Sequence, residues 1–309
     1  MFFKFTQAII AFFTAIIALI APQTPSQGIT PDAPLKNVNP NSIAEAVSTQ
    51  DVTIMSYNLK ISGDGIRSPE KRVKHIVNTI NEKAPDSLGV QEADKAWVER
   101  LAAQLPEYAH IEKYRDDGIS EGEASAIFYL KDKYDLVESG HFWLSETPDV
   151  PSLGWDAACN RICSYAILKD KATGFVYAHF NVHFDHVGAK AQTESVPLIA
   201  SKIAEIAPDI PVVLTGDFNV SEGSDHYNNL LSCGLKDTKY LAEKYDDHAT
   251  YHGYHVIMPS TEPIDFVFVN GYVSHVESSR IDSGFVDHIL ASDHFPITVK
   301  MTLFNGGAN

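Results

Sequence analysis

The stretch PVVLTGDFN, residues 211–219, is an apolar run that ends in polar side chains. Its β-branched residues predict a buried strand over 211–216, after which Asp217 and Asn219 follow. A side chain at the end of such a strand leaves the core and meets a shared cleft. Five further strings repeat the pattern along the chain with Asn, Asp, Glu or His: YNLK (57–60), QE (91–92), NVHFDH (181–186), ID (264–265) and SDH (292–294). The sequence therefore predicts one site assembled from several strand ends.

Other short runs of β-branched or aromatic residues also predict strands. The predicted strands are 52–57, 87–90, 125–130, 162–168, 175–182, 211–216, 264–269 and 297–303. Stretches with helical periodicity lie between several of them, at 69–82, 95–105 and 191–206. Strands and helices interleave through the whole length, and 44% of the 309 residues are hydrophobic. We therefore predict one α/β domain with two facing sheets and helices outside.

The chain is strongly acidic, with a formal net charge of −16. Residues 1–50 contribute nothing to it, because Lys4 and Lys36 cancel Asp32 and Glu45. A folded body this acidic repels polyanions, so tight binding along a nucleic-acid backbone is not favoured. A small phosphorylated substrate held through a metal ion remains compatible with this charge.

The N-terminal segment resembles an export signal. Lys4 is followed by an apolar stretch over residues 8–21, which is short for a full membrane span. Pro22 follows the best cleavage position, Ala21, and would hinder cleavage there. A retained membrane anchor is therefore the alternative. Residues 22–50 are rich in Pro, Ser, Gln and Asn and predict a flexible tether. The predicted organisation is a signal peptide or anchor (1–21), a linker (22–50) and a catalytic domain (51–309), placed outside the cytoplasm.

Three cysteines, Cys159, Cys163 and Cys233, make an odd count with no disulfide framework. Cys159 and Cys163 are close enough in sequence to close a small loop if oxidised. The alternative is that the cysteines are small buried hydrophobic residues. A zinc site is not predicted, because paired CxxC spacing is missing.

The acidic residues at strand ends need partners. Glu92 follows SLGVQ, and Asp217 with Asn219 follows VVLTG. A carboxylate at the end of a buried strand is costly unless a metal ion or hydrogen-bond donors compensate it. Oxygen ligands suit a hard divalent cation, and His183 and His294 can move protons near neutral pH. For any one string, a turn or a helix cap is the competing interpretation.

The six strings in this order resemble the endonuclease/exonuclease/phosphatase superfamily, which includes deoxyribonuclease I-like enzymes. The resemblance runs from about residue 52 to residue 303, and GDFN with SDHFP is its most specific part. It implies a four-layer α/β sandwich and a phosphoester hydrolase that depends on Mg²⁺ or Mn²⁺. The strings FWLSETP, GWDA and NVHFDHVG are similar to those of exported bacterial members.

The resemblance also implies a metal centre. Glu92 would bind the principal metal ion, and Asn58 would lie beside it, in reach of the substrate. Asp217 and Asn219 would orient the attacking water and the phosphate, with Asp217 as a further metal ligand. Asp293 would be another metal ligand or a base.

The same resemblance assigns acid–base and substrate-binding roles. His294, paired with Asp265, would contact the phosphate and support the nucleophile. His183 would be the general acid for the leaving oxygen, and Glu123 would steady it. Arg161, in NRICSYA, would contact the phosphate, although an arginine after a loop also occurs as a surface ion pair.

Several residues keep two interpretations. Asp185 and His186 either extend the metal site or cap the helix that follows Gly188. The histidines of HATYHGYH bind metal, belong to a substrate loop or are merely solvated. Two tryptophans either line the cleft or pack beneath it. These residues are His248, His252 and His255, and Trp143 and Trp155.

The leading hypothesis is a metal-dependent phosphodiesterase or phosphatase that acts on a small or lipid-linked phosphoester outside the cytoplasm. A secreted nuclease and a catalytically silent binding protein on the same scaffold are the alternatives. The expected partners are the phosphoester and, through residues 1–21, a membrane. Long nucleic acid is less favoured, and we expect a monomer.

Overall fold

The computed structural model describes residues 48–255, 261–283 and 290–306. The predicted signal peptide or anchor and most of the predicted tether lie outside these residues. Thr49 and Gln50, which were assigned to the tether, already belong to the first strand. Among the described helices, none has the length and apolar character needed to cross a bilayer.

Two mixed β-sheets form the centre of the molecule. The seven-stranded sheet has the order β10 (Ala242–Tyr245), β12 (Val273–Ile281), β13 (Ile297–Phe304), β1 (Thr49–Asn58), β2 (Ser87–Ala93), β4 (Ala124–Leu130) and β3 (Tyr108–Ile111). The six-stranded sheet has the order β5 (Tyr134–Trp143), β6 (Ile162–Asp170), β7 (Val176–His183), β8 (Val212–Asp217), β11 (Asp265–Val269) and β9 (Lys236–Asp237). The pairs β1/β2, β7/β8 and β10/β12 are parallel, and the other pairs are antiparallel.

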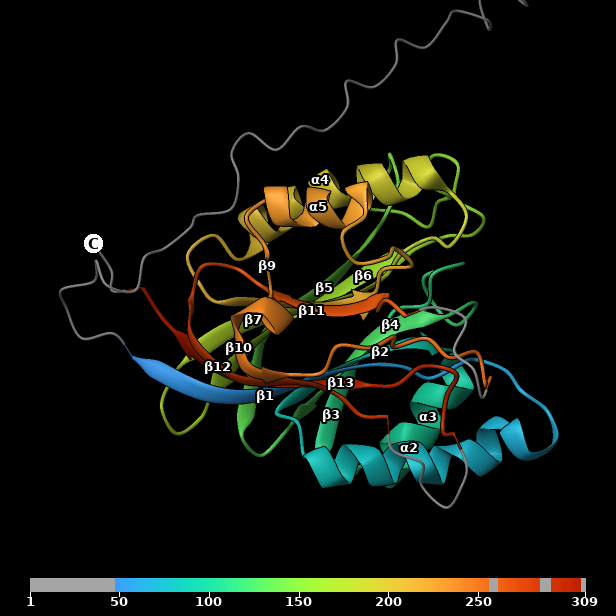
Figure 1. Cartoon of the computed structure of the whole chain (residues 1–309), viewed down its shortest axis with the longest axis horizontal. Helices are drawn as coiled ribbons and strands as arrows, with labels where there is room; N and C mark the ends of the chain where they lie inside the picture. Colours follow the sequence, from blue (N-terminus) through green and yellow to red (C-terminus); the bar gives the residue numbers. More distant parts are fainter. Residues whose placement is uncertain (1–47, 256–260, 284–289, 307–309) are drawn as a thin grey trace, which may run out of the picture.

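Helices cover the outer faces of both sheets. Figure 1 shows α4 (Ala189–Ile206) and α5 (Asp225–Ser232) over the six-stranded sheet, and α2 (Pro69–Lys83) and α3 (Lys95–Gln104) over the seven-stranded sheet. Separate apolar clusters fill the two helix–sheet layers and the space between the sheets. The short helices η2 (Gly65–Arg67) and α6 (Thr238–Leu241) lie in connections. The prediction of a four-layer α/β sandwich is confirmed.

The strand residues that face the opposite sheet change from apolar to polar toward one end. On β8 this series runs Val213, Thr215, Asp217, while the alternate residues pack against α4 and α5. On β1 it runs from Val52 to Asn58. Because side chains alternate along a strand, each series ends in a polar group directed between the sheets. The polar ends of several strands therefore meet at one end of the sandwich.

A buried polar network joins the two sheets next to this end. Asn181 of β7 donates its amide to the carbonyl oxygens of Val90 and Ala126 in the other sheet, at 2.9 and 3.0 Å. The Gln91 amide donates to Asn181 Oδ1 at 2.7 Å. Gly89 is required here, because a Cβ atom would overlap Asn181 and Thr215. Asn181 and Gln91 thus fix how the sheets stack and do not themselves line the site.

All eight predicted strands and all three predicted helices are present, with boundaries that differ by one to three residues. The sequence analysis did not predict β5 or β12, whose exposed polar positions obscure the alternation, or the short strands β3, β9 and β10. The three cysteines are free. Cys163 is fully buried in the cluster beneath α4, so the proposed Cys159–Cys163 closure is not formed.

Candidate active site

The residues that the sequence singled out gather at the polar end of the sandwich. They are Asn58 at the end of β1, Glu92 in β2, Glu123 before β4, Arg161 before β6, His183 at the end of β7, Asp217 at the end of β8, Asn219 just beyond it, Asp265 at the start of β11, and Asp293 with His294 before β13. Strand pairing brings three of them side by side, because Asp217 is in register with both His183 and Asp265.

Asp217 lies at the centre of the site and is only 2% exposed. Its Oδ2 accepts a hydrogen bond from Asn58 Nδ2 at 2.8 Å, which links the two sheets. The same oxygen lies 3.6 Å from His183 Nε2 and 3.7 Å from His294 Nε2. Burial and the neighbouring Asp265 raise the pKa of Asp217 to about 7. One carboxylate is thus flanked by two imidazoles and can accept a proton near neutral pH.

His294 is held in its protonated form. Its Nδ1 lies 2.8 Å from Asp265 Oδ2. Burial alone would lower the pKa of His294, but the charges of Asp265 and Asp217 outweigh it and raise the pKa to about 10. The ring of Tyr251 packs on the imidazole at a centroid distance of 5.0 Å. At neutral pH His294 is therefore an oriented cation.

His183, unlike His294, is neutral. Burial, followed by the positive charges of Arg161 and Arg115, holds its pKa well below the usual range. Its Nδ1 lies 3.8 Å from Glu123 and makes no hydrogen bond within the described residues. Glu123 pairs instead with Arg115 Nη1 at 2.6 Å. His183 is neutral without substrate, so a role as general acid requires a bound phosphate to raise its pKa.

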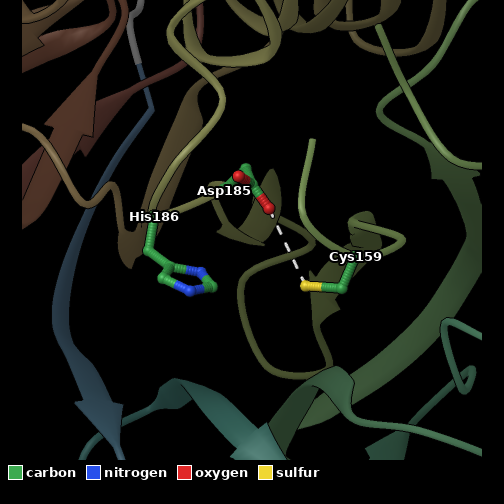
Figure 2. Close-up of side chains that lie close together, drawn as sticks. All are labelled: Cys159, Asp185 and His186. Atoms are coloured by element: carbon green, nitrogen blue, oxygen red, sulfur yellow. Dashed lines mark hydrogen bonds between the residues drawn. The ribbon is translucent and has the colours of Figure 1, made fainter. Parts of the chain in front are cut away.

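Arg161 is clamped by residues that follow β7. Its Nε lies 3.4 Å from Asp185 Oδ2, and its Nη2 lies 3.0 Å from His186 Nδ1. Figure 2 shows Asp185, His186 and Cys159 grouped together, with the Cys159 thiol donating to Asp185 at 3.7 Å. The Arg161 charge opposes a metal ion among these three donors. Arg161 Nη1 is buried and makes no hydrogen bond within the described residues, which leaves it available to an anion.

Asp185 also organises the chain before α4. Its Oδ1 accepts hydrogen bonds from the backbone N–H groups of Val187 at 3.0 Å and Gly188 at 2.8 Å. These hydrogen bonds form a turn before α4 and do not cap the helix, because the N–H groups of Lys190 and Ala191 bind Asp156 instead. The capping interpretation of Asp185 is therefore wrong. Asp185 therefore serves the turn with one oxygen and Arg161 with the other.

The carboxylates of Glu92 and Asp293, near Asn58, suit a divalent cation. Lys60 Nζ lies 3.8 Å from Glu92 Oε2 and 3.4 Å from Asp293 Oδ2, so a positive group already stands between two carboxylates. Asn58 Nδ2 lies 3.3 Å from Glu92 Oε1. Carboxylate and amide oxygens are ligands for Mg²⁺ or Mn²⁺. Glu92 and Asp293 would hold such an ion, with Asn58 and Asp217 beside it.

The backbone is strained around the site. Lys60, Glu92 and Asn219 have φ of 56°, 55° and 50°, in the left-handed region that non-glycine residues rarely adopt. The Asn219 N–H donates to Asp217 Oδ1 at 3.0 Å, and its side-chain amide donates to Phe184 O at 3.0 Å. Hydrogen bonds to Asp217 and to the residue after β7 therefore hold the conformation of Asn219.

The sequence analysis missed Lys60, Arg72 and Arg115. Arg72 of α2 is fully buried and donates to the carbonyl oxygens of Leu59 at 2.6 Å and Ala291 at 2.8 Å. It thereby ties the loop after β1 to the segment before Asp293. Its i, i+4, i+8 spacing with Ile76 and Ile80 could have placed it on the buried face of the helix. No comparable signal marks Arg115.

The segment 248–255 lies beside the segment that contains Asp293. The backbone N–H groups of His252 and Gly253 donate to Asp293 O at 2.9 and 3.1 Å. The ring of His252 packs on Phe295. No potential metal cluster within the described residues includes His248, His252 or His255.

The two tryptophans have different surroundings. Trp143 is buried and donates its indole N–H to Arg115 O at 2.7 Å, so it packs beneath the site. Trp155 is partly buried and packs against the cluster that includes α4.

Comparison with known proteins defines the class. The model of the Endonuclease/Exonuclease/phosphatase family matches residues 55–294. The chain therefore belongs to this family. Its members are hydrolases of phosphoesters, and the chain is a phosphoesterase by class.

Three similar proteins illustrate the match. A solved endonuclease/exonuclease/phosphatase from Bacteroides vulgatus is 38% identical with a TM-score of 0.79, over 82% of this chain and 99% of that chain. The mannosyl-6-phosphatase Bt3783 of Bacteroides thetaiotaomicron is 36% identical with a TM-score of 0.76, over 81% of this chain and 99% of that chain. Uncharacterized protein L388 of Acanthamoeba polyphaga mimivirus is 31% identical over 163 residues. That stretch is 50% of this chain, which spans only 60% of the viral protein.

Proposed function

We propose that the protein is a phosphatase or phosphodiesterase that depends on Mg²⁺ or Mn²⁺ and acts on a small phosphorylated compound. The observation that carries this proposal is the position of Asp217 between a neutral His183 and a protonated His294. Asp217 as a base, His294 as a cation and His183 as a neutral imidazole thus lie next to one another, as hydrolysis of a phosphoester requires.

The residues divide the work of hydrolysis. Arg161 and the His294 imidazolium bind the oxygens of the phosphate. Asp217 accepts a proton from the attacking water, whose oxygen forms a bond to phosphorus while the bond to the leaving oxygen breaks. The negative phosphate raises the pKa of His183, which then protonates the leaving oxygen. Glu92 and Asp293 would hold a divalent cation, which would neutralise part of the phosphate charge.

The proposed substrate class is a sugar phosphate. Its support is the 36% identity to a mannosyl-6-phosphatase over 81% of this chain. The net charge of −16 disfavours long nucleic acid. Export through residues 1–21 would place the reaction outside the cytoplasm, either in a released protein or at a membrane. We also propose that the protein is a monomer. Cell fractionation, N-terminal sequencing and size-exclusion chromatography test these three points.

A substrate panel tests the proposed activity. Mannose 6-phosphate, bis(p-nitrophenyl) phosphate, sphingomyelin and plasmid DNA are incubated with the protein in Mg²⁺, in Mn²⁺ and in EDTA. We expect metal-dependent release of phosphate from the sugar phosphate. Faster cleavage of plasmid DNA at physiological salt would favour the nuclease instead. Full activity in EDTA, or no hydrolysis of any phosphoester, would contradict the proposal.

A further inference from the structure

The ammonium group of Lys60 occupies a position that a divalent cation would also seek. It lies 3.8 Å from Glu92 Oε2 and 3.4 Å from Asp293 Oδ2. Both carboxylates are largely buried, with side-chain exposures of 13% and 5%. Two facing carboxylates with little solvent repel each other unless a positive charge lies nearby. Lys60 supplies that charge from within the chain.

We propose that Lys60 is an internal counter-ion that competes with the divalent cation for Glu92 and Asp293. The inference rests on the proposed metal-dependent function and adds a residue that sets the affinity for the metal. When the cation binds, the ammonium leaves the two carboxylates. When the cation dissociates, the ammonium returns and neutralises them.

The local backbone directs Lys60 at the carboxylates. Its φ of 56° places the backbone in the left-handed region. Its N–H donates to Asn58 Oδ1 at 3.0 Å, and its carbonyl accepts from Arg72 Nη2 at 2.5 Å. Lys60 is therefore fixed at its backbone between a residue of the proposed metal centre and a buried arginine. Only its flexible four-carbon stem is free to move.

The charge and exposure of Lys60 fit an exchangeable cation. Burial lowers the pKa of Lys60, but Glu92 and Asp293 outweigh it and raise the pKa, so the group stays charged. Its side chain is 35% exposed, which gives the ammonium a route to solvent. A divalent ion bound to the same oxygens would repel the ammonium strongly at such short range. The two cations therefore exclude each other from this position.

The alternative role for Lys60 is to orient Glu92 and Asp293 for the metal. The two roles predict opposite results when the ammonium is removed. A competitor weakens metal binding, so its loss strengthens binding. An orienting group assists metal binding, so its loss weakens binding.

Calorimetric titration with Mn²⁺ tests the inference without measuring activity. Lys60→Met keeps most of the length of the side chain and removes its charge. Lys60→Gly removes the side chain and suits the left-handed φ, so it serves if the first variant fails to fold. Lys74→Met, at an exposed position of α2, makes the same change in net charge elsewhere.

We expect Lys60→Met to bind Mn²⁺ about tenfold more tightly than the wild type, and Lys74→Met to bind like the wild type. In EDTA the melting temperature of Lys60→Met should fall, and its rise on adding Mn²⁺ should exceed that of the wild type. Unchanged or weaker Mn²⁺ binding by Lys60→Met, with normal binding by the wild type, would overturn the inference alone. Absence of Mn²⁺ binding in both proteins would overturn the proposed metal centre as well.

Discussion

The imidazole of His294 donates from Nδ1 to Asp265 Oδ2 at 2.8 Å, and both side chains are at most 5% exposed. Asp265 begins β11, whereas His294 precedes β13 in the other sheet. The contact thus spans the two sheets and fixes the ring so that Nε2 faces Asp217 at 3.7 Å. Asp265 therefore orients His294 and, together with Asp217, keeps it charged.

Asp265→Asn should lower the pKa of His294 and slow hydrolysis by ~10²-fold or more. The amide keeps the shape of the side chain but removes the charge that favours the imidazolium. Histidine resonances followed by NMR give the pKa, and kcat gives the rate. Asp135→Asn, at an exposed position of β5, is the control and should change neither. Near-normal kcat in Asp265→Asn would show that His294 does not need this partner.

The metal-free protein should lose stability as the pH rises from about 6.5 to about 10. The folded protein holds the His294 proton up to about pH 10, whereas the unfolded chain releases it near 6.5. The stabilisation is therefore complete below 6.5 and is lost toward 10. The raised pKa of Asp217 has the same sign, but acts only up to about pH 7. Urea midpoints in EDTA at pH 7.5 and 9.5 should differ in the wild type and differ less in His294→Gln. An equal change of the urea midpoint in the two proteins would contradict the assignment of this pH dependence to His294.

The sequence predicted the fold and most of the site from local features. Apolar runs bounded by polar residues located Asn58 and Asp217 at strand ends and Asp265 at a strand start, because both boundaries are visible in the sequence. The residues that bind these side chains were harder to predict from the sequence. Glu123 is bound by Arg115, which no motif marks, and this contact depends on how the connection between β3 and β4 folds back on itself. Similarly, Lys60 stands in a quoted string, but only the structure shows its ammonium between Glu92 and Asp293.

Glu92→Gln should abolish hydrolysis and weaken Mn²⁺ binding about tenfold or more, because a neutral amide is a poor ligand for a hard cation. The side chain also accepts a hydrogen bond from Ile61 N at 2.9 Å, which one amide oxygen can still accept. We therefore expect a folded protein by circular dichroism. Glu82→Gln, on the exposed face of α2, should retain both properties. Near-normal activity of Glu92→Gln in Mg²⁺ would remove Glu92 from the metal centre.

Arg72→Met should destabilise the protein by ~3 kcal/mol, because it leaves the buried carbonyl oxygen of Leu59 and the partly buried ones of Lys60 and Ala291 without this donor. Urea unfolding measures the loss. Arg100→Met, which breaks an exposed pair with Glu70, should leave the midpoint nearly unchanged. A similar small effect at Arg72 would mean that the loop after β1 is held by other contacts.

Asp185→Asn should raise KM about tenfold with a smaller change in kcat. The Asp185 carboxylate stays charged, since hydrogen bonds from Gly188 and Val187, together with Arg161, overcome the effect of burial and lower its pKa to about 2. The asparagine keeps an oxygen for the turn but loses the charge that holds Arg161. Steady-state kinetics and the inhibition constant of inorganic phosphate measure the effect. Asp156→Asn is the matched control, because Asp156 accepts from backbone N–H at the start of α4, at Ala191, close to the turn that Asp185 binds, but makes no ion pair with Arg161. If kcat fell in Asp185→Asn while KM stayed constant, Arg161 would act in the chemical step and not in holding the phosphate.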